Sequence, residues 1–237
     1  MIIKKILVSS ILKVKSKYIV LHLFLTIFLL LFAAQIKGQS ENYIERTRLS
    51  FKEAYIEDEP AEAVKSWKVP FQTEDRFKLN TIKVISVFGA PRDSYLKGHI
   101  HTAADIIPAK LSSYNNVYPM ANGIICSIHL EHPHKTIVIK HRLLDSTIVY
   151  TSYKHLHEIY ITNGMQVNQD TKLARLYTRE EAKKQDGSYD HLQLEIRKSF
   201  YDYGCASWLT MTKDELNKYF YNPVDFMKKY LGEINEF

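Results

Sequence analysis

Two stretches of the chain place histidines at spacings that suit a shared site. In GHIHTAADII, three residues separate His101 from Asp105, and an extended chain would put both on one face with the small Ala103 between them. In YKHLHEIYITNG, His155 and His157 alternate along a predicted strand end that precedes an Asn-Gly turn. Imidazole and carboxylate groups in such patterns are zinc ligands. A buried histidine bonded to an aspartate, or solvated histidines at a strand rim, would give the same spacing, so both interpretations stay open.

The stretch DHLQLEI adds a third candidate face. His191 and Gln193 are two residues apart between leucines, so a strand would turn both polar side chains to one face and the leucines to the other. This face is typical of a metal site, of a hydrogen-bonding pair, or of a metal site that has lost a ligand.

Taken in order along the chain, the motifs resemble one family of enzymes. The segments GHIHTAADI, NVYPMANGIICSI, IVIKH, VYTSYKHLHEIYITNGMQV, YDHLQLEIR and NPVDF, within roughly residues 84 to 227, resemble the lysostaphin/LytM-type zinc metallopeptidases, which cut peptidoglycan cross-bridges. The resemblance implies that His101 and Asp105 are zinc ligands and that His155 and His191 are catalytic histidines. It places Gln193 where the family has its third zinc ligand.

Gln193 is a departure from the family pattern. A catalytic zinc takes three protein ligands of imidazole or carboxylate type plus a water molecule, and a neutral amide oxygen is a poor zinc ligand. One hypothesis is therefore an exported cell-wall protein that binds peptidoglycan cross-link peptides, or regulates another wall hydrolase, with zinc weak or absent. The alternative is an active zinc metalloendopeptidase in which His99, His157 or Gln193 supplies the third ligand.

The distribution of residue types along the sequence predicts a mainly β fold. Short β-branched and aromatic runs bounded by turn residues (TIKVISVF, GIICSIHL, KTIVIKH, STIVYTSY and YDHLQLEIR) predict an antiparallel β-sandwich or barrel-like body of the LytM peptidase type with short flanking helices. We expect a lead-in segment over 39–78, a LytM-like peptidase domain over 79–200, and a C-terminal extension over 201–237 that packs on the domain. Pro223 is expected to begin a helical turn in that extension.

The N-terminal residues 1–38 have the pattern of a signal peptide or a membrane anchor. Their six lysines come without an acidic residue, and five of them precede the apolar run YIVLHLFLTIFLLLFAA. The body is therefore expected in the cell envelope, the periplasm or outside the cell, with membrane contact only through this segment. The other residues carry 26 basic side chains (32 minus 6) against 26 acidic ones, so the net charge of +6 comes from the leader and does not indicate nucleic-acid binding.

Cys126 and Cys205 are the only cysteines. An oxidising compartment would allow them to pair, and two buried free thiols are an equal alternative. Two cysteines alone do not make a zinc site.

Overall fold

The protein falls into two compact units, Met1–Arg46 and Thr47–Phe237. The structure is a computed structural model that describes residues 22, 24–32, 62–93, 98–111, 115–131, 133–185, 187–200 and 213–231. In the first unit, residues 24–32 form a helix with exposed apolar side chains. Within the described part of the chain, no helix combines the length and apolarity needed to cross a membrane. Most of the predicted leader lies outside the described residues, and its assignment stays a prediction.

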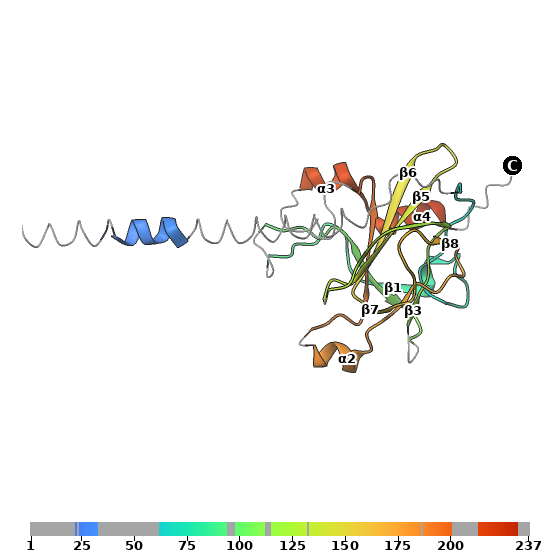
Figure 1. Cartoon of the computed structure of the whole chain (residues 1–237), viewed down its shortest axis with the longest axis horizontal. Coiled ribbons are helices and arrows are strands. Elements are labelled where there is room, and N and C mark those ends of the chain that lie inside the picture. The colour runs from blue at the N-terminus through green and yellow to red at the C-terminus, as the bar shows by residue number, and fades with distance from the viewer. Residues whose placement is uncertain are drawn as a thin grey trace, which may run out of the picture. The chain divides into compact units, whose positions relative to one another are not determined.

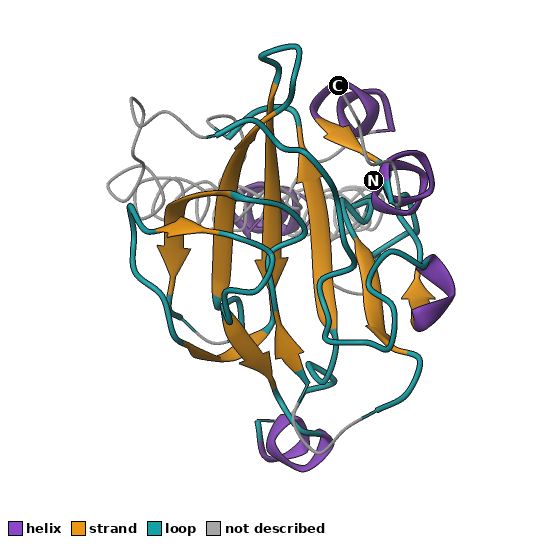
Figure 2. Cartoon of the chain, turned by 90° about the vertical axis from the view of Figure 1, so that its right-hand side faces the viewer, coloured by secondary structure: helices purple, strands orange, loops and turns teal. Residues whose placement is uncertain are grey.

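The second unit is built on two antiparallel sheets (Figures 1 and 2). The larger sheet has eight strands in the order β1-β2-β10-β6-β5-β4-β8, with β11 paired to β10. Its strands are β1 (Ile82–Ser86), β2 (Ala104–Pro108), β4 (Gly123–His129), β5 (Thr136–Arg142), β6 (Ile148–Lys154), β8 (Gln166–Val167), β10 (Leu192–Arg197) and β11 (Phe220–Tyr221). The smaller sheet has the order β3-β9-β7, with β3 (Asn116–Val117), β9 (Ala174–Leu176) and β7 (Leu156–Ile159). The prediction of a mainly β, antiparallel fold is confirmed, and each predicted strand run contains an observed strand.

The strand β10 lies inside the large sheet and is buried on both faces. Leu192, Leu194 and Ile196 belong to the main hydrophobic core, because alternate side chains of a strand point to one face. The opposite face carries polar groups, among them Gln193, and these are buried as well. Buried polar side chains need hydrogen-bond partners within the protein. The polar face of β10 is therefore a candidate functional site.

The described part of the lead-in segment packs against the body. Trp67, Val69 and Phe71 are buried in the main core, and Phe71 forms a bridge with Val117 of β3. Trp67 also stacks edge-on against Phe226 at a ring-centroid distance of 4.8 Å. Residues 62–78 are thus part of the folded body, whereas the predicted lead-in residues 39–61 lie outside the described residues.

Short helices surround the sheets (Figure 1). They are a 3-10 turn η1 (Leu79–Thr81), α2 (Arg179–Lys184), α3 (Lys213–Tyr219) and α4 (Pro223–Tyr230). Helix α4 begins at Pro223 as predicted, with the Asn222 side chain accepting a hydrogen bond from the Val224 amide. Helix α2 was not predicted, although its capping box of Thr178 and Glu181 is a recognisable sequence signal.

Candidate functional site

Gln193 lies at the centre of a row of polar side chains that crosses three strands. It stands opposite Asp105 in the pairing of β10 with β2, and opposite Lys154 in the pairing of β10 with β6. Directly paired residues of antiparallel strands project to the same face with Cβ atoms about 4.5 to 5.5 Å apart. All three side chains are buried. The sheet therefore sets the predicted third-ligand position between a carboxylate and an ammonium group.

His101 lies in the loop before β2 and faces Asp105 of that strand. Its Nδ1 lies 3.0 Å from the carbonyl oxygen of Val87, and because a carbonyl only accepts, Nδ1 carries a hydrogen. His101 Nε2 lies 3.2 Å from Asp105 Oδ1, and within the described residues neither buried atom makes a hydrogen bond of normal geometry. Two ligands on a tetrahedral zinc, with bonds of about 2.1 Å, are about 3.4 Å apart. This pair therefore has the spacing of two metal ligands.

The Asp105 carboxylate also contacts an arginine and a second histidine. Arg92 Nη2 donates to Asp105 Oδ2 at 3.0 Å and to Ser86 Oγ at 2.7 Å. His191 Nε2 lies 3.5 Å from Asp105 Oδ1. Burial alone would raise the pKa of Asp105, but its contacts with His101 and His191 outweigh burial and hold that pKa well below its usual value. Asp105 is therefore ionised at neutral pH, and a guanidinium already neutralises it.

His155 sits where β6 gives way to β7, in a left-handed backbone conformation with φ of 67°. Its Nδ1–H donates to the carbonyl oxygen of Pro133 at 2.8 Å, which leaves a lone pair on Nε2. Its ring packs 5.1 Å from the ring of His191 and 5.0 Å from that of Tyr189. Burial, reinforced by the charges of His191 and Lys154, lowers the pKa of His155 to about 3. His155 is therefore neutral at pH 7 and able to accept a hydrogen bond.

These side chains surround a cavity of about 170 Å³. Its lining consists of Arg92, His99, His101, His134, Lys154, His155, Tyr189 and Gln193. The predicted positions His101, Asp105, His155, His191 and Gln193 are thus brought together in and directly beside one cavity. Their roles remain predictions.

Four lining residues were missed in the sequence. Tyr189 had a usable signal, because it extends the two-residue spacing of His191 and Gln193 backwards. Lys154 sits at a strand end, where a charged residue is ordinarily expected in solvent. Arg92 and His134 come from loops, whose paths no periodicity in the sequence predicts.

The two histidines proposed as substitute ligands have different positions. His157 lies in the smaller sheet, with its ring 4.5 Å from that of Tyr177 and its Nε2 3.7 Å from a carboxylate oxygen of Glu181. The prediction that His155 and His157 lie on one strand end is wrong, because the left-handed backbone at His155 turns the chain from β6 into β7. His99 does line the cavity, and burial, reinforced by neighbouring positive groups, lowers its pKa to about 4.

A buried ion pair continues the polar face of β10 beyond Gln193. Arg197 Nε donates to Glu195 Oε2 at 2.8 Å, and Arg197 Nη2 donates to Ser152 Oγ on β6 at 3.3 Å. The hydroxyl of Thr102 donates to the other carboxylate oxygen of Glu195. Thr102 adjoins His101 in the chain, so this network ties the loop that carries His101 to β10.

These residues do not fit a complete catalytic zinc site. His101 and Asp105 supply suitable donor atoms, but the next position in the row is the amide of Gln193. Over the residues that the structure describes, no group of three or more His, Cys, Asp or Glu side chains is arranged to hold a metal ion. Lys154 also brings a positive charge to the row, which opposes a divalent cation.

Cys126 is a buried thiol on β4. Its Sγ donates to the carbonyl oxygen of Val138 at 3.4 Å, and burial raises its pKa to about 12. Cys205 lies outside the described residues, so the pairing of the two cysteines stays an open prediction.

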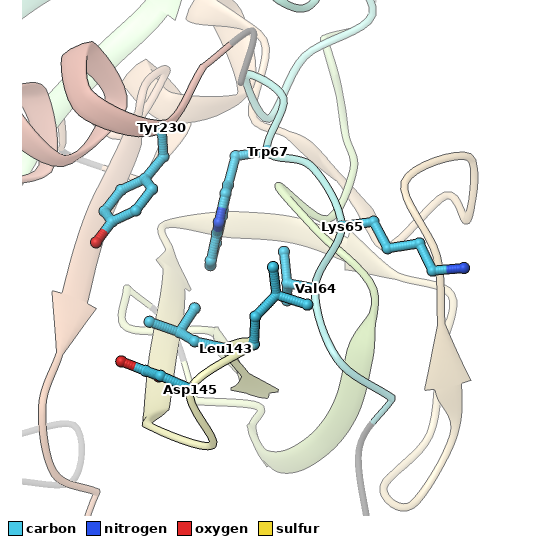
Figure 3. Close-up of a pocket in the computed structure, with 7 residues that line it drawn as sticks. Val64, Lys65, Trp67, Leu143, Asp145 and Tyr230 are labelled. Carbon is cyan, nitrogen blue, oxygen red and sulfur yellow. The ribbon is translucent and has the colours of Figure 1, made fainter. Parts of the chain in front are cut away.

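A second cavity, of about 210 Å³, lacks the chemistry of the first (Figure 3). It lies between the lead-in segment, the turn after β5 and helix α4, and its lining includes Val64, Lys65, Trp67, Leu143, Asp145 and Tyr230. This lining contains no histidine and a single carboxylate, so its composition is that of a packing gap at the surface.

Comparisons with known proteins give similarities to solved structures alone. No protein-family model matches the chain, and no curated protein matches it. A chain of the SpoIIQ-SpoIIIAH pore forming complex is 14% identical, with a TM-score of 0.43, and the match covers 73% of this chain and 97% of that chain. The antimicrobial peptidase lysostaphin from Staphylococcus simulans is 15% identical, with a TM-score of 0.40, over 67% of this chain and 56% of that chain.

A zinc containing peptidase from Vibrio cholerae also matches, at 20% identity and a TM-score of 0.39, over 57% of this chain and 37% of that chain. The matched structures thus include a peptidase of the lysostaphin type, the class that the ordered motifs resemble. Because each TM-score is below 0.5, the resemblance of this chain to that class rests on its own motifs.

Proposed function

We propose that this chain carries a LytM-type domain that binds peptidoglycan cross-link peptides without cleaving them by zinc catalysis. The observation that carries the proposal is the row Asp105–Gln193–Lys154 across β2, β10 and β6. His101 Nε2 and Asp105 Oδ1 lie 3.2 Å apart, as two metal ligands would. The next positions in the row, however, hold an amide and an ammonium group, and neither is a suitable zinc ligand.

Peptide binding is a chemistry that the cavity supports. His155 is neutral and presents the lone pair of Nε2, which accepts a hydrogen bond from a peptide N–H. The amide of Gln193 donates and accepts, as a peptide group requires. The ring of Tyr189 packs beside His155 and offers an apolar surface to a side chain. Convergent polar groups in a concave site are what fixes the orientation of a bound ligand.

We further propose that the domain is exported. The support is the lysine-rich start followed by an apolar run over the first 38 residues, which is typical of a signal peptide or an N-terminal anchor. The domain would then meet peptidoglycan in the cell envelope, in the periplasm or outside the cell. Regulation of another wall hydrolase is a role open to such a binding domain.

The test is binding and cleavage measured on the same material. The full chain is incubated with purified insoluble peptidoglycan, and both the protein that sediments and the peptides released into solution are measured. We expect co-sedimentation that Tyr189→Ala weakens, with no peptide release above that of a boiled sample. Failure of the protein to sediment with peptidoglycan would refute the proposal.

The facing pair of His101 and Asp105 favours a second candidate, an active zinc metalloendopeptidase. Two buried donor atoms at ligand spacing, without hydrogen bonds of normal geometry, are the arrangement that a metal would complete. Gln193 or His99, which line the cavity, or His191, whose Nε2 lies 3.5 Å from Asp105 Oδ1, would supply the third ligand. Peptide release that a chelator stops and added zinc restores would establish this candidate in place of the first.

A further inference from the structure

The cavity that holds the histidines has a neighbour, which we call the side pocket. The side pocket has a volume of about 250 Å³, against about 170 Å³ for the cavity with the histidines. Its lining includes Ile85, Ile107, Leu111, Tyr177, Arg179 and Asp190.

Two segments lead from the histidine-lined cavity to the side pocket. On β2, Ile107 stands two residues after Asp105, and alternate residues of a strand point to the same face. Before β10, Tyr189 lines the histidine-lined cavity and the next residue, Asp190, lines the side pocket. Two residues of an extended chain span about 7 Å, which is also the spacing of side chains along one face of an extended peptide. One extended peptide is therefore long enough to place a group in each of the two.

Part of the side pocket is apolar and open to solvent. Ile85 of β1 is 54% exposed and Leu111 is 67% exposed, and both line the pocket together with the half-buried Ile107. Exposed apolar side chains beside a pocket are stabilised when a hydrocarbon group covers them. The side pocket therefore suits a ligand group with an apolar stem.

The side pocket also carries two charges of opposite sign, Arg179 and Asp190. They lie near the two ends of the connection between β9 and β10. Arg175 of β9 is already paired with Glu158 and Glu181, whereas Arg179 and Asp190 form no ion pair with any other described residue. A guanidinium donates to a carboxylate, and a carboxylate accepts from an ammonium group. A ligand group that carries both charges therefore matches this pocket better than a group with one.

We propose that the side pocket binds the side chain of a diamino-dicarboxylic acid residue in the bound peptide. The hydrocarbon stem of that side chain lies on Ile85, Ile107 and Leu111. Its carboxylate accepts from Arg179, and its ammonium group donates to Asp190. The inference rests on the proposed peptide-binding function and names a residue of the peptide that the domain recognises.

Four probes of the form acetyl-alanyl-X-alanine amide test this inference on the full chain. X is norleucine, lysine, 2-aminopimelic acid or 2,6-diaminopimelic acid, the last in both configurations of its side-chain centre. The four share one carbon stem, and its last carbon carries no charged group, an amino group, a carboxylate or both. Because the ends are capped, the side chain of X is the only source of charge. We expect the diaminopimelic probe to bind about ten-fold or more tightly than the norleucine probe, with the two single-charge probes between them.

Two variants assign each charge to its partner. Arg179→Gln should weaken binding of the two probes that carry a carboxylate, and Asp190→Asn should weaken binding of the two that carry an amino group. Lys183→Gln and Glu180→Gln, on α2 and outside the lining of the side pocket, are the matched controls and should leave all four affinities unchanged. Thermal unfolding of each variant checks that it is folded.

Equal binding of the four probes, or binding of none of them, would overturn the inference. A preference for the diaminopimelic probe that survives unchanged in both Arg179→Gln and Asp190→Asn would also overturn it. The proposed function stands under these results if the chain still sediments with peptidoglycan, whereas loss of sedimentation refutes the proposed function itself.

Discussion

Lys154 stands directly opposite Gln193 in the pairing of β6 with β10, on the same face as Asp105. The position next to the missing ligand therefore holds a positive charge. In general, a unit charge about 5 Å from a metal ion, at an effective dielectric constant of about 20, opposes each unit of metal charge by roughly 3 kcal/mol. Two obstacles to zinc binding thus lie side by side, the amide of Gln193 and the ammonium of Lys154.

Restoring the ligand alone should therefore not restore the metal site. We expect Gln193→His to raise zinc affinity only slightly, and Gln193→His combined with Lys154→Ala to raise it by about 100-fold or more over the unmodified chain, because both obstacles are removed. The measurement is a zinc titration with a competing chelator. Tight zinc binding by Gln193→His alone would show that Lys154 does not oppose the metal.

The two arginine–carboxylate pairs should differ in their effect on stability. The Arg197 side chain is 2% exposed, so Arg197→Met leaves the buried charge of Glu195 without its guanidinium and should lower the free energy of unfolding by about 3 to 5 kcal/mol. The Arg92 side chain is 28% exposed, so Arg92→Met should cost about 1 kcal/mol or less. Urea unfolding of both variants measures these changes. Equal losses in the two variants would contradict the difference in burial.

Stability should fall as the solution is acidified below pH 6.5. His141 is completely buried, with its ring nitrogens bonded to the Asn122 carbonyl oxygen and the Thr151 hydroxyl, and burial lowers its pKa to about 4. The unfolded chain takes up a proton near pH 6.5 while folded His141 stays neutral, so stability present above pH 6.5 is lost as pH falls toward 4. Between pH 6.5 and pH 5 this amounts to about 2 kcal/mol.

The contribution of His141 is isolated by a variant. His141→Gln removes the titrating group, so its loss of stability between pH 7 and pH 5 should be smaller than that of the unmodified chain by about 2 kcal/mol. Urea unfolding at the two pH values gives the comparison. An identical loss in both proteins would mean that His141 does not titrate with a lowered pKa in the folded state.

The sequence predicted the strands well, and for a clear physical reason. A strand that packs on a core has apolar side chains, often β-branched or aromatic, on one or both of its faces. The strands β4, β5, β6 and β10 each show this pattern within the run that predicted them. The helix start at Pro223 was predicted because proline favours the first helical turn. These are local signals, and local structure follows them.

Which residues line the cavity depends on strand pairing, register and loop paths, and none of these could be predicted from the sequence. That Lys154 faces Gln193 follows from which strands pair and in which register, and both are set by the whole sheet. The misplacement of His157 came from a single left-handed residue, His155, where an extended chain was expected. Arg92 reaches Asp105 from a loop, and no periodicity predicts the path of a loop.

Cys126 should be unreactive in the folded protein. It is fully buried and its pKa is raised to about 12, so almost no thiolate is present at neutral pH. In a Cys205→Ser variant, we expect no alkylation of the native chain by iodoacetamide at pH 7.5 and stoichiometric alkylation in urea. Rapid alkylation of the native variant, measured by mass spectrometry, would show that this part of β4 opens to solvent.

The most direct test of a zinc-free binding site is the metal content of the purified full chain, prepared without chelators and measured by elemental analysis beside the variant His101→Ala. Because the third ligand position holds Gln193 and Lys154 adds a positive charge, we predict no more zinc in the unmodified chain than in His101→Ala. One zinc per chain that disappears in His101→Ala would contradict this account and establish that the site has found another third ligand.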